Sequence, residues 1–198
     1  MNQLRYLCAA ACVASLTTSC AIKTPSQLRY EAFKARSDYQ KTHEVYREES
    51  ILKTANQNNT VVKIDLSDQR AQLLVGKRQE VAIDLPCSTG KAGKRTPTGD
   101  FTIKQKITRK RSTIFGRLYR GRRFVYAGDR RRYRGHYTRF VGSSLPYWMR
   151  LTNQGIGMHY SRGVRRYACS NGCIRMPMES VKVIYSKTKV GTPVQITH

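Results

Sequence analysis

The chain has 198 residues, with 37 Lys and Arg against 12 Asp and Glu, and its formal net charge is +25 at pH 7. This length allows one domain with a sizeable core plus a targeting segment. A hydrophobic fraction of 39% with 25% charged residues excludes a wholly disordered chain and a polytopic membrane protein. Six cysteines in a chain of this length are too few for a small protein stabilised mainly by disulfides, so that class is excluded. The charge alone would favour nucleic acid as the partner.

Residues 1–20 have the pattern of a secretory signal peptide. Arg5 precedes a short apolar run, Tyr6–Leu16, and small polar residues follow up to Cys20. A membrane span needs about 20 apolar residues, so this run is too short. The step into Cys20 is similar to a bacterial lipoprotein cleavage site, although the expected Leu lies one position too far upstream. Ordinary signal-peptidase cleavage is the alternative.

Either form of cleavage places the mature chain outside the cytoplasm, so nucleic acid is not expected as a partner. The expected location is the periplasmic face of the cell envelope, with a lipid on Cys20 as the membrane anchor. Ala21 directly after that cysteine is compatible with sorting to the outer membrane of a Gram-negative bacterium.

A helical stalk is expected over residues 21–58. Thr24 is a candidate helix cap, Pro25 suits the first turn, and Gln27 can fold back to complete a capping box. Apolar and aromatic side chains then recur among charged ones, and no glycine occurs before Gly76. We interpret this segment as a spacer between an anchor and a domain.

From residue 59 onward the pattern predicts a mainly β domain with one short late helix, ending at residue 198. Apolar and polar residues alternate with a period of two in several short runs, which are separated by turn residues. The expected strands are 62–66, 71–75, 81–85, 101–107 and 194–197, with another around 148–152, and the expected helix is 178–188.

Residues 104–147 are expected to form a basic insertion in this domain. Between Lys104 and Arg150 the chain has fifteen Lys or Arg and a single acid, Asp129. Arg, Gly and Tyr recur there without a fixed period, so the segment is not a repeat. Its arginines could contact anionic envelope polymers, and a solvated basic loop is the alternative.

A cysteine and a histidine are candidates for nucleophilic chemistry. His159 ends an apolar run typical of a strand, and Cys173 follows Gly172, so backbone N–H groups there could approach an oxyanion. A thiol becomes a strong nucleophile only beside a base or a positive charge. Arg175 could bind a carboxylate. On spacing alone, a buried cysteine and a hydrogen-bonded histidine would be the simpler interpretation.

The surroundings of this pair form an ordered set of motifs. Gly155-Ile156-Gly157-Met158-His159 precedes Ser170-Asn171-Gly172-Cys173-Ile174-Arg175, and the further features are 64–66, 72–73, 88–91, 96–101, 145–151 and 191–194. Over about residues 60–198 this set resembles the L,D-transpeptidase catalytic domain (YkuD-like) family. The resemblance implies a β-sandwich enzyme that crosslinks peptidoglycan with a cysteine nucleophile and no metal or organic cofactor.

The resemblance also implies a role for each site residue. Cys173 would attack the tetrapeptide stem and release D-alanine, and a diamino-acid side-chain amine on a neighbouring stem would resolve the thioester. His159 would be the base, oriented by the backbone carbonyl of Tyr160. The amides of Gly172 and Cys173 would hold the oxyanion, while Arg175 and Ser170 would bind the donor stem.

Two site positions depart from the family pattern, and one of them is Tyr160, where the family frequently has Gly or Ala. Asn171 lies where the family commonly has a histidine, and an amide can donate a hydrogen bond but cannot take a proton. The alternatives to crosslinking are hydrolysis of the same thioester by an L,D-carboxypeptidase, attachment of a protein to peptidoglycan, and a non-catalytic binder of anionic polymer.

The other cysteines allow three arrangements. Cys87 could pair with Cys169 in an oxidising compartment and leave Cys173 free. A Cys169–Cys173 pair would instead lock the nucleophile. A zinc site formed by His136, His159, Cys169 and Cys173 is disfavoured, because Cys-x3-Cys is not the usual spacing of a zinc knuckle.

Overall fold

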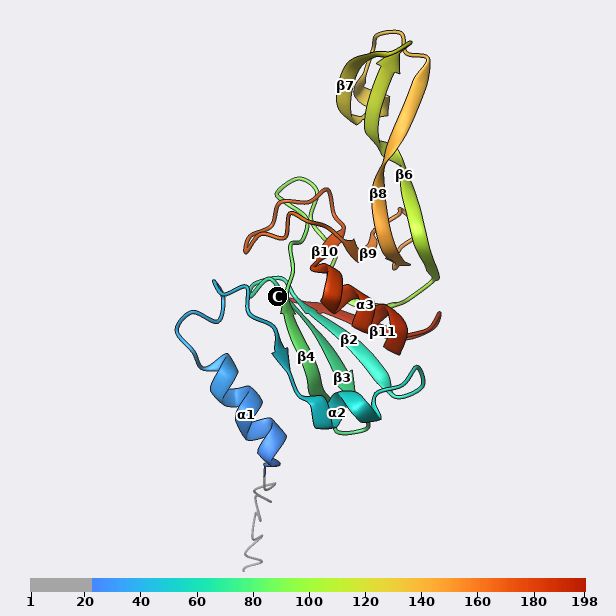
Figure 1. Cartoon of the computed structure of the whole chain (residues 1–198). Helices are drawn as coiled ribbons and strands as arrows, with labels where there is room; N and C mark the ends of the chain where they lie inside the picture. The colour runs from blue at the N-terminus through green and yellow to red at the C-terminus, as the bar shows by residue number, and fades with distance from the viewer. Residues whose placement is uncertain (1–22) are drawn as a thin grey trace, which may run out of the picture.

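Six strands form the first sheet of the computed structural model, which describes residues 23–198 (Figure 1). Their order is β1-β4-β3-β2-β11-β5, with β11 parallel to β2 and antiparallel to β5. The predicted signal peptide and Cys20 lie outside the described residues. The strands are β1 (Tyr46–Arg47), β2 (Thr60–Asp65), β3 (Arg70–Val75), β4 (Glu80–Pro86), β5 (Gly99–Thr102) and β11 (Pro193–Thr197).

Five strands form the second sheet, in the order β10-β9-β8-β6-β7. They are β6 (Gln105–Arg120), β7 (Arg123–Asp129), β8 (Arg139–Arg150), β9 (Gly157–Tyr160) and β10 (Ile174–Met176). The helices are α1 (Pro25–Lys34), α2 (Glu49–Thr54), α3 (Met178–Lys187) and the 3-10 turn η1 (Arg130–Arg132). The predicted fold class, a mainly β sandwich with a short late helix, is confirmed.

One hydrophobic core joins both sheets and α3. The alternation of buried and partly exposed residues that forms this core is clear in β2, where Val62 and Ile64 are fully buried and their neighbours along the strand are partly exposed. Met158 of β9 and Ile174 of β10 enter the same core from the second sheet, and Ile184 enters it from α3. The core therefore fixes one face of the two strands that lead to the candidate site.

The run predicted as a single strand over 101–107 is divided between the sheets. Ile103 N–H donates to the carbonyl of Thr192 beside the first sheet, while Lys104 N–H donates to Arg150 in the second. The prediction of one strand was wrong because period-2 alternation continues through a point at which the chain changes sheets.

The N-terminal segment forms the predicted capped helix, but it is not a spacer. The Thr24 side chain accepts from the Gln27 N–H, and the Gln27 side chain accepts from the Thr24 N–H. Beyond α1, the chain folds back and pairs β1 with β4 in the first sheet. Phe33 is buried. The segment from residue 23 to 58 thus packs on the sheet as part of the same folded unit.

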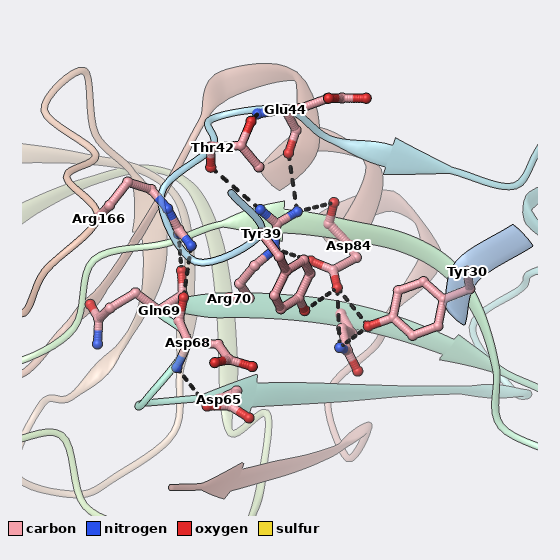
Figure 2. Close-up of polar contacts among 11 residues, drawn as sticks. Tyr30, Tyr39, Thr42, Glu44, Asp65, Asp68, Gln69, Arg70, Asp84 and Arg166 are labelled. Carbon is pink, nitrogen blue, oxygen red and sulfur yellow. Dashed lines mark hydrogen bonds and ion pairs between the residues drawn. The ribbon is translucent and has the colours of Figure 1, made fainter. Parts of the chain in front are cut away.

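A buried ion pair explains this packing. Arg70 on β3 and Asp84 on β4 are both completely buried and hydrogen-bonded to each other (Figure 2). The phenols of Tyr30 and Tyr39 donate to the second carboxylate oxygen of Asp84 at 2.7 and 2.8 Å. Burial, with the Asp84 charge, raises the pKa of both phenols, so they remain donors. The N-terminal segment therefore supplies the partners that a buried carboxylate requires.

The segment predicted as a basic insertion is ordered β structure. Its strands β6 and β8 pair over most of their length, and β7 adds to the outer end of β6. Figure 1 shows this hairpin projecting away from the first sheet. Neither interpretation from sequence, an insertion or a solvated loop, anticipated that β6 and β8 are central strands of the second sheet.

Candidate active site

Two parallel strands place the candidate nucleophile and base. In the register of β9 and β10, Ile174 lies opposite Met158 and Arg175 lies opposite His159. Ile174 and Met158 are fully buried in the core. Because successive side chains alternate between faces, His159 and Arg175 share the other face. Cys173 immediately precedes β10, and it lines the same cavity as these two residues.

His159 is buried and oriented by its own backbone. Its Nδ1 lies 2.7 Å from the carbonyl oxygen of Tyr160, which only accepts, so Nδ1 carries the proton and Nε2 has the free lone pair. The Trp148 ring lies 6.1 Å from the imidazole, centroid to centroid. Burial, opposed by the hydrogen bond to the Tyr160 carbonyl and assisted by the nearby Arg175 charge, lowers the pKa of His159 to about 4. The imidazole is therefore neutral at pH 7.

Cys173 is half-buried, and its thiol donates a weak hydrogen bond to the carbonyl of Gly155 at 3.8 Å. Burial raises the pKa of this thiol, and the Gly157 N–H and the Arg175 charge oppose that rise. The resting pair is thus a neutral thiol and a neutral imidazole. An attack by this thiol on a substrate would therefore require its proton to move to His159.

The turn before Cys173 is fixed by its own polar groups. Gly172 has φ +109°, a conformation that favours glycine. The Ser170 hydroxyl accepts from the Gly172 N–H at 3.0 Å and donates to the Cys173 carbonyl at 2.5 Å. Thr96 donates to the Gly172 carbonyl at 2.8 Å.

These bonds bear on two predicted roles. Ser170 lines the cavity but is almost completely buried, and its hydroxyl is engaged twice in shaping the turn. The Gly172 N–H is bonded to Ser170 and is not free to hold an oxyanion. Within residues 23–198, the Cys173 N–H has no acceptor and remains the free backbone donor at this position.

Cys173 and His159 open into a cavity of about 910 Å³ between the turn and the base of the hairpin. Tyr160, Asn171, Gly172 and Arg175 also line it. Eight lining residues are basic and none is acidic. The basic ones are Lys94, Arg95, Lys110, Arg117, Arg131, Arg150, Arg162 and Arg175. A cavity of this composition is suited to an anionic ligand.

Comparison with known proteins identifies the family. The model of the L,D-transpeptidase catalytic domain (YkuD) matches residues 59–196, which is well over half of the chain. The chain belongs to this family. No curated protein sequence matches the chain closely. The sequence prediction of a YkuD domain is confirmed.

Solved structures of other YkuD proteins show the same fold at low identity. An L,D-transpeptidase from Mycobacterium smegmatis is 20% identical with a TM-score of 0.54, and the match covers 71% of this chain and 59% of that one. One from Stackebrandtia nassauensis is 20% identical with a TM-score of 0.53, covering 88% and 67%. LdtMt1 in complex with imipenem is 19% identical with a TM-score of 0.54, covering 70% and 59%. This chain thus spans about three fifths of the first of these relatives.

Two residues that were not predicted as site residues, Thr89 and Gln69, support the turn before Cys173. The carbonyl of Thr89 accepts the N–H groups of Cys169 and Ser170, both at 2.9 Å. Gln69 in turn holds Thr89, because its side chain donates to the Thr89 hydroxyl at 2.7 Å and accepts from the Thr89 N–H at 2.9 Å. Ser88-Thr89 was recognised only as part of a motif, and Gln69 gives no sequence signal because it occupies an ordinary turn.

The same support includes a second arginine. Arg166, in the loop before the catalytic turn, donates to the backbone carbonyls of Gln69 and Asp68 (Figure 2). On the other side of that loop, the Ser88 hydroxyl bonds to the Arg165 backbone. The loop is thereby attached to the first sheet.

None of the alternative cysteine arrangements is formed. Cys87, Cys169 and Cys173 are all free, so neither suggested disulfide is present. Cys87 is fully buried, and burial raises the pKa of its thiol to about 12, so it is chemically inert. Among residues 23–198, no three His, Cys, Asp or Glu side chains are grouped to hold a metal ion, and His136 is exposed. In the same range no helix is both long and apolar enough to cross a membrane.

The burial of His159 predicts an unusual pH dependence. Protonation removes the lone pair at Nε2, so we expect kcat/KM to fall about tenfold per unit only below about pH 4. The His159 pKa is lower folded than unfolded, so its contribution to stability is also lost as pH falls from 6.5 through about 4. A pH–rate profile, with folding monitored by circular dichroism, tests this. A decline that starts near the ordinary histidine pKa would contradict it.

Proposed function

We propose that this YkuD protein is a peptidoglycan L,D-transpeptidase. One observation supports it most: a half-buried thiol and a buried imidazole, oriented by the Tyr160 carbonyl, open into one cavity with only basic charges. This arrangement suits a cysteine acyltransferase acting on an acidic peptide.

In the proposed first step, the Cys173 sulfur attacks the carbonyl carbon that precedes the terminal D-alanine of a tetrapeptide stem. His159 takes the thiol proton at Nε2 and delivers it to the departing amine. The C–N bond breaks, free D-alanine leaves, and a thioester forms on Cys173. In the second step a diamino-acid side-chain amine attacks the thioester carbon and gives a proton to His159. The new C–N bond forms, the C–S bond breaks, and His159 returns the proton to the Cys173 sulfur.

The oxyanion formed in both steps needs donors that the turn does not already use. The Cys173 N–H is one, since the Gly172 N–H is bonded to Ser170. We assign the second to the side-chain amide of Asn171, which is exposed and lines the same cavity. Two oriented donors stabilise a developing oxyanion by far more than they stabilise the ground-state carbonyl.

The basic lining gives the binding side of the proposal. Arg175 lies opposite His159 in the strand register, and its guanidinium also contacts the sulfur of Cys169 at 3.7 Å. That contact keeps the guanidinium beside the nucleophile, where it can bind a stem carboxylate. Placement in the cell envelope, with a lipid on Cys20, is part of the proposal and is supported by the pattern of residues 1–20.

Product analysis tests the function and identifies the acceptor. We would incubate the purified chain from residue 23 onward with a soluble disaccharide-tetrapeptide and follow the products by mass spectrometry. A crosslinked dimer with loss of D-alanine is the expected result. Tripeptide alone would indicate an L,D-carboxypeptidase, and transfer only to an added protein lysine would indicate protein attachment. No turnover by a folded protein would favour a non-catalytic binder.

Substitution at Asn171 tests the second donor. Asn171→Ala is expected to lower kcat about 10²-fold and leave KM nearly unchanged, because the donor acts mainly on the oxyanion. Asn171→His, which restores a ring N–H donor, should recover most of the activity. Steady-state kinetics on the soluble stem measures both variants. An Asn171→Ala enzyme with unchanged kcat would contradict the assignment.

A further inference from the structure

The outer part of the hairpin, residues 117–139, is densely and uniformly basic. We call it the hairpin tip. Of its charged residues nine are arginine, one is an acid and none is lysine. All nine arginines are exposed. They are Arg117, Arg120, Arg122, Arg123, Arg130, Arg131, Arg132, Arg134 and Arg139.

Almost none of this charge is neutralised within the described chain. Asp129 pairs with Arg131 at 2.7 Å, and within residues 23–198 no other carboxylate forms an ion pair with a tip arginine. The bond to Arg131 lowers the pKa of Asp129 to about 2, so that carboxylate is already engaged. Eight like charges on one short hairpin repel each other, and an anionic ligand would relieve the repulsion.

Aromatic rings hold some of the tip arginines in place. The guanidinium carbon of Arg139 lies 4.3 Å from the Tyr119 ring centroid, and that of Arg130 lies 5.0 Å from the Phe140 centroid. Stacking uses the face of a guanidinium and leaves its N–H edge free. That edge binds carboxylate or phosphate groups in a bidentate manner, which lysine cannot do.

A second cavity connects the tip to the catalytic cavity. It has a volume of about 410 Å³ and is lined by Arg132 and Tyr126 of the tip and by the backbone loop at Lys91. Asp129 is its acidic lining residue. It shares four residues with the catalytic cavity, namely Lys94, Phe115, Gly128 and Asn171. The two cavities therefore adjoin, and together they extend from Cys173 to Arg132 and Tyr126 of the tip.

We propose that the second cavity and the hairpin tip bind the polymeric form of the substrate, beyond the stem that reacts with Cys173. The bound groups would be the carboxylates of further stem peptides on the same peptidoglycan network. This inference rests on the proposed function. Continuity with the catalytic cavity favours the substrate polymer as occupant over an anionic membrane surface, which would need no connection to Cys173.

The test compares a polymer with a soluble substrate. The tip variant replaces Arg120, Arg122, Arg123 and Arg134 with serine, because none of these four lines either cavity. The matched control replaces four exposed basic residues outside the hairpin, Lys41, Lys53, Lys77 and Arg78, and so removes the same charge. A third variant, Arg132→Ser, removes the tip arginine that lines the second cavity.

Each of the three variants is made in two backgrounds. With Cys173→Ala, co-sedimentation measures binding to insoluble peptidoglycan, and with Cys173 intact, turnover of the soluble tetrapeptide is measured. We expect the tip variant to lose at least about tenfold in polymer affinity and the control to lose little. Arg132→Ser should be intermediate. All should turn over the soluble stem at similar rates, and binding should weaken as salt rises.

Equal sedimentation of the tip and control variants would overturn the proposal. The proposal would also be overturned if the tip variant lost binding to vesicles containing phosphatidylglycerol but not to peptidoglycan, because that result would assign the tip to a membrane surface. Failure of the proposed function can be distinguished from failure of this inference. If the proposed function is wrong, the protein that keeps Cys173 does not turn over the soluble stem, and co-sedimentation still measures binding by the tip. Recovery of only part of the affinity by the Arg→Lys versions would support bidentate contacts over charge alone.

Discussion

Replacing Cys173 with alanine is expected to abolish acyl-enzyme formation and lower turnover by at least about three orders of magnitude. The reason is that Cys173 is the thiol that lines the cavity together with His159, whereas Cys87 is fully buried with a pKa raised to about 12. Intact-protein mass spectrometry after incubation with a carbapenem measures the effect. The wild-type protein should gain the mass of one drug molecule and Cys173→Ala should gain none.

Cys87→Ala is the matched control for this experiment, since it removes a thiol far from the solvent and should keep the full adduct. Circular dichroism on each variant verifies that the fold is retained. An adduct on Cys173→Ala would place the nucleophile elsewhere. Absence of an adduct on the wild-type protein, before and after reduction, would count against an activated thiol and against the transpeptidase proposal.

Asp84→Ala is expected to be the most destabilising single substitution outside the core. It leaves the fully buried guanidinium of Arg70 without its carboxylate and removes the acceptor of both Tyr30 and Tyr39. Breaking a buried pair by removing one partner costs about 3–5 kcal/mol of unfolding free energy. For a chain of this size that corresponds to a decrease in Tm of about 10 °C. Thermal and urea denaturation measure it.

Glu44→Ala provides the comparison, because it removes an exposed ion pair with Arg36 at 2.6 Å but keeps the Glu44 backbone carbonyl that accepts from Arg70. Exposed pairs contribute about 1 kcal/mol or less. If Asp84→Ala were no more harmful than Glu44→Ala, the Arg70 charge would have to be stabilised by something other than this network, and the role given to the N-terminal segment would be wrong.

Much of the first sheet could be predicted from sequence because its burial is one-sided. Val62 and Ile64 alternate with partly exposed residues, and the strand that contains them was found within two residues of its true start. The hairpin was missed for the opposite reason. Strands β6 and β8 are solvated on both faces over much of their length, so their apolar residues show no period of two.

The N-terminal segment shows a different limit of sequence patterns. The helix cap at Thr24 is local and was predicted correctly. The partners of Tyr30 and Tyr39 lie about 50 residues away, on the polar face of a strand that looks solvent-exposed in sequence. Period-2 alternation predicts which face of β4 carries Asp84, but it does not predict that this polar face is covered.

At the site, the predicted residues lie together, but the hydrogen bonds decide their use. Cys173 and His159 could be proposed from the family resemblance, although their spacing alone favoured a structural role. That Ser170 uses the Gly172 N–H could not, since the bond depends on the positive φ of Gly172 and on the position of the turn above Thr89. Such local geometry is settled by tertiary contacts and leaves no mark in the residue order.

The position of β11 has a consequence for the order of folding. This strand is the last of the six in sequence, yet it lies inside the first sheet, between β2 and β5. A chain that emerges from its N-terminus onward, at a ribosome or through a translocation pore, exposes two unpaired strand edges until residue 197 is free. The sheet therefore closes only once β11 has emerged, in one late event with long sequence separation, and the stage with exposed edges is the one most open to aggregation or capture by a chaperone.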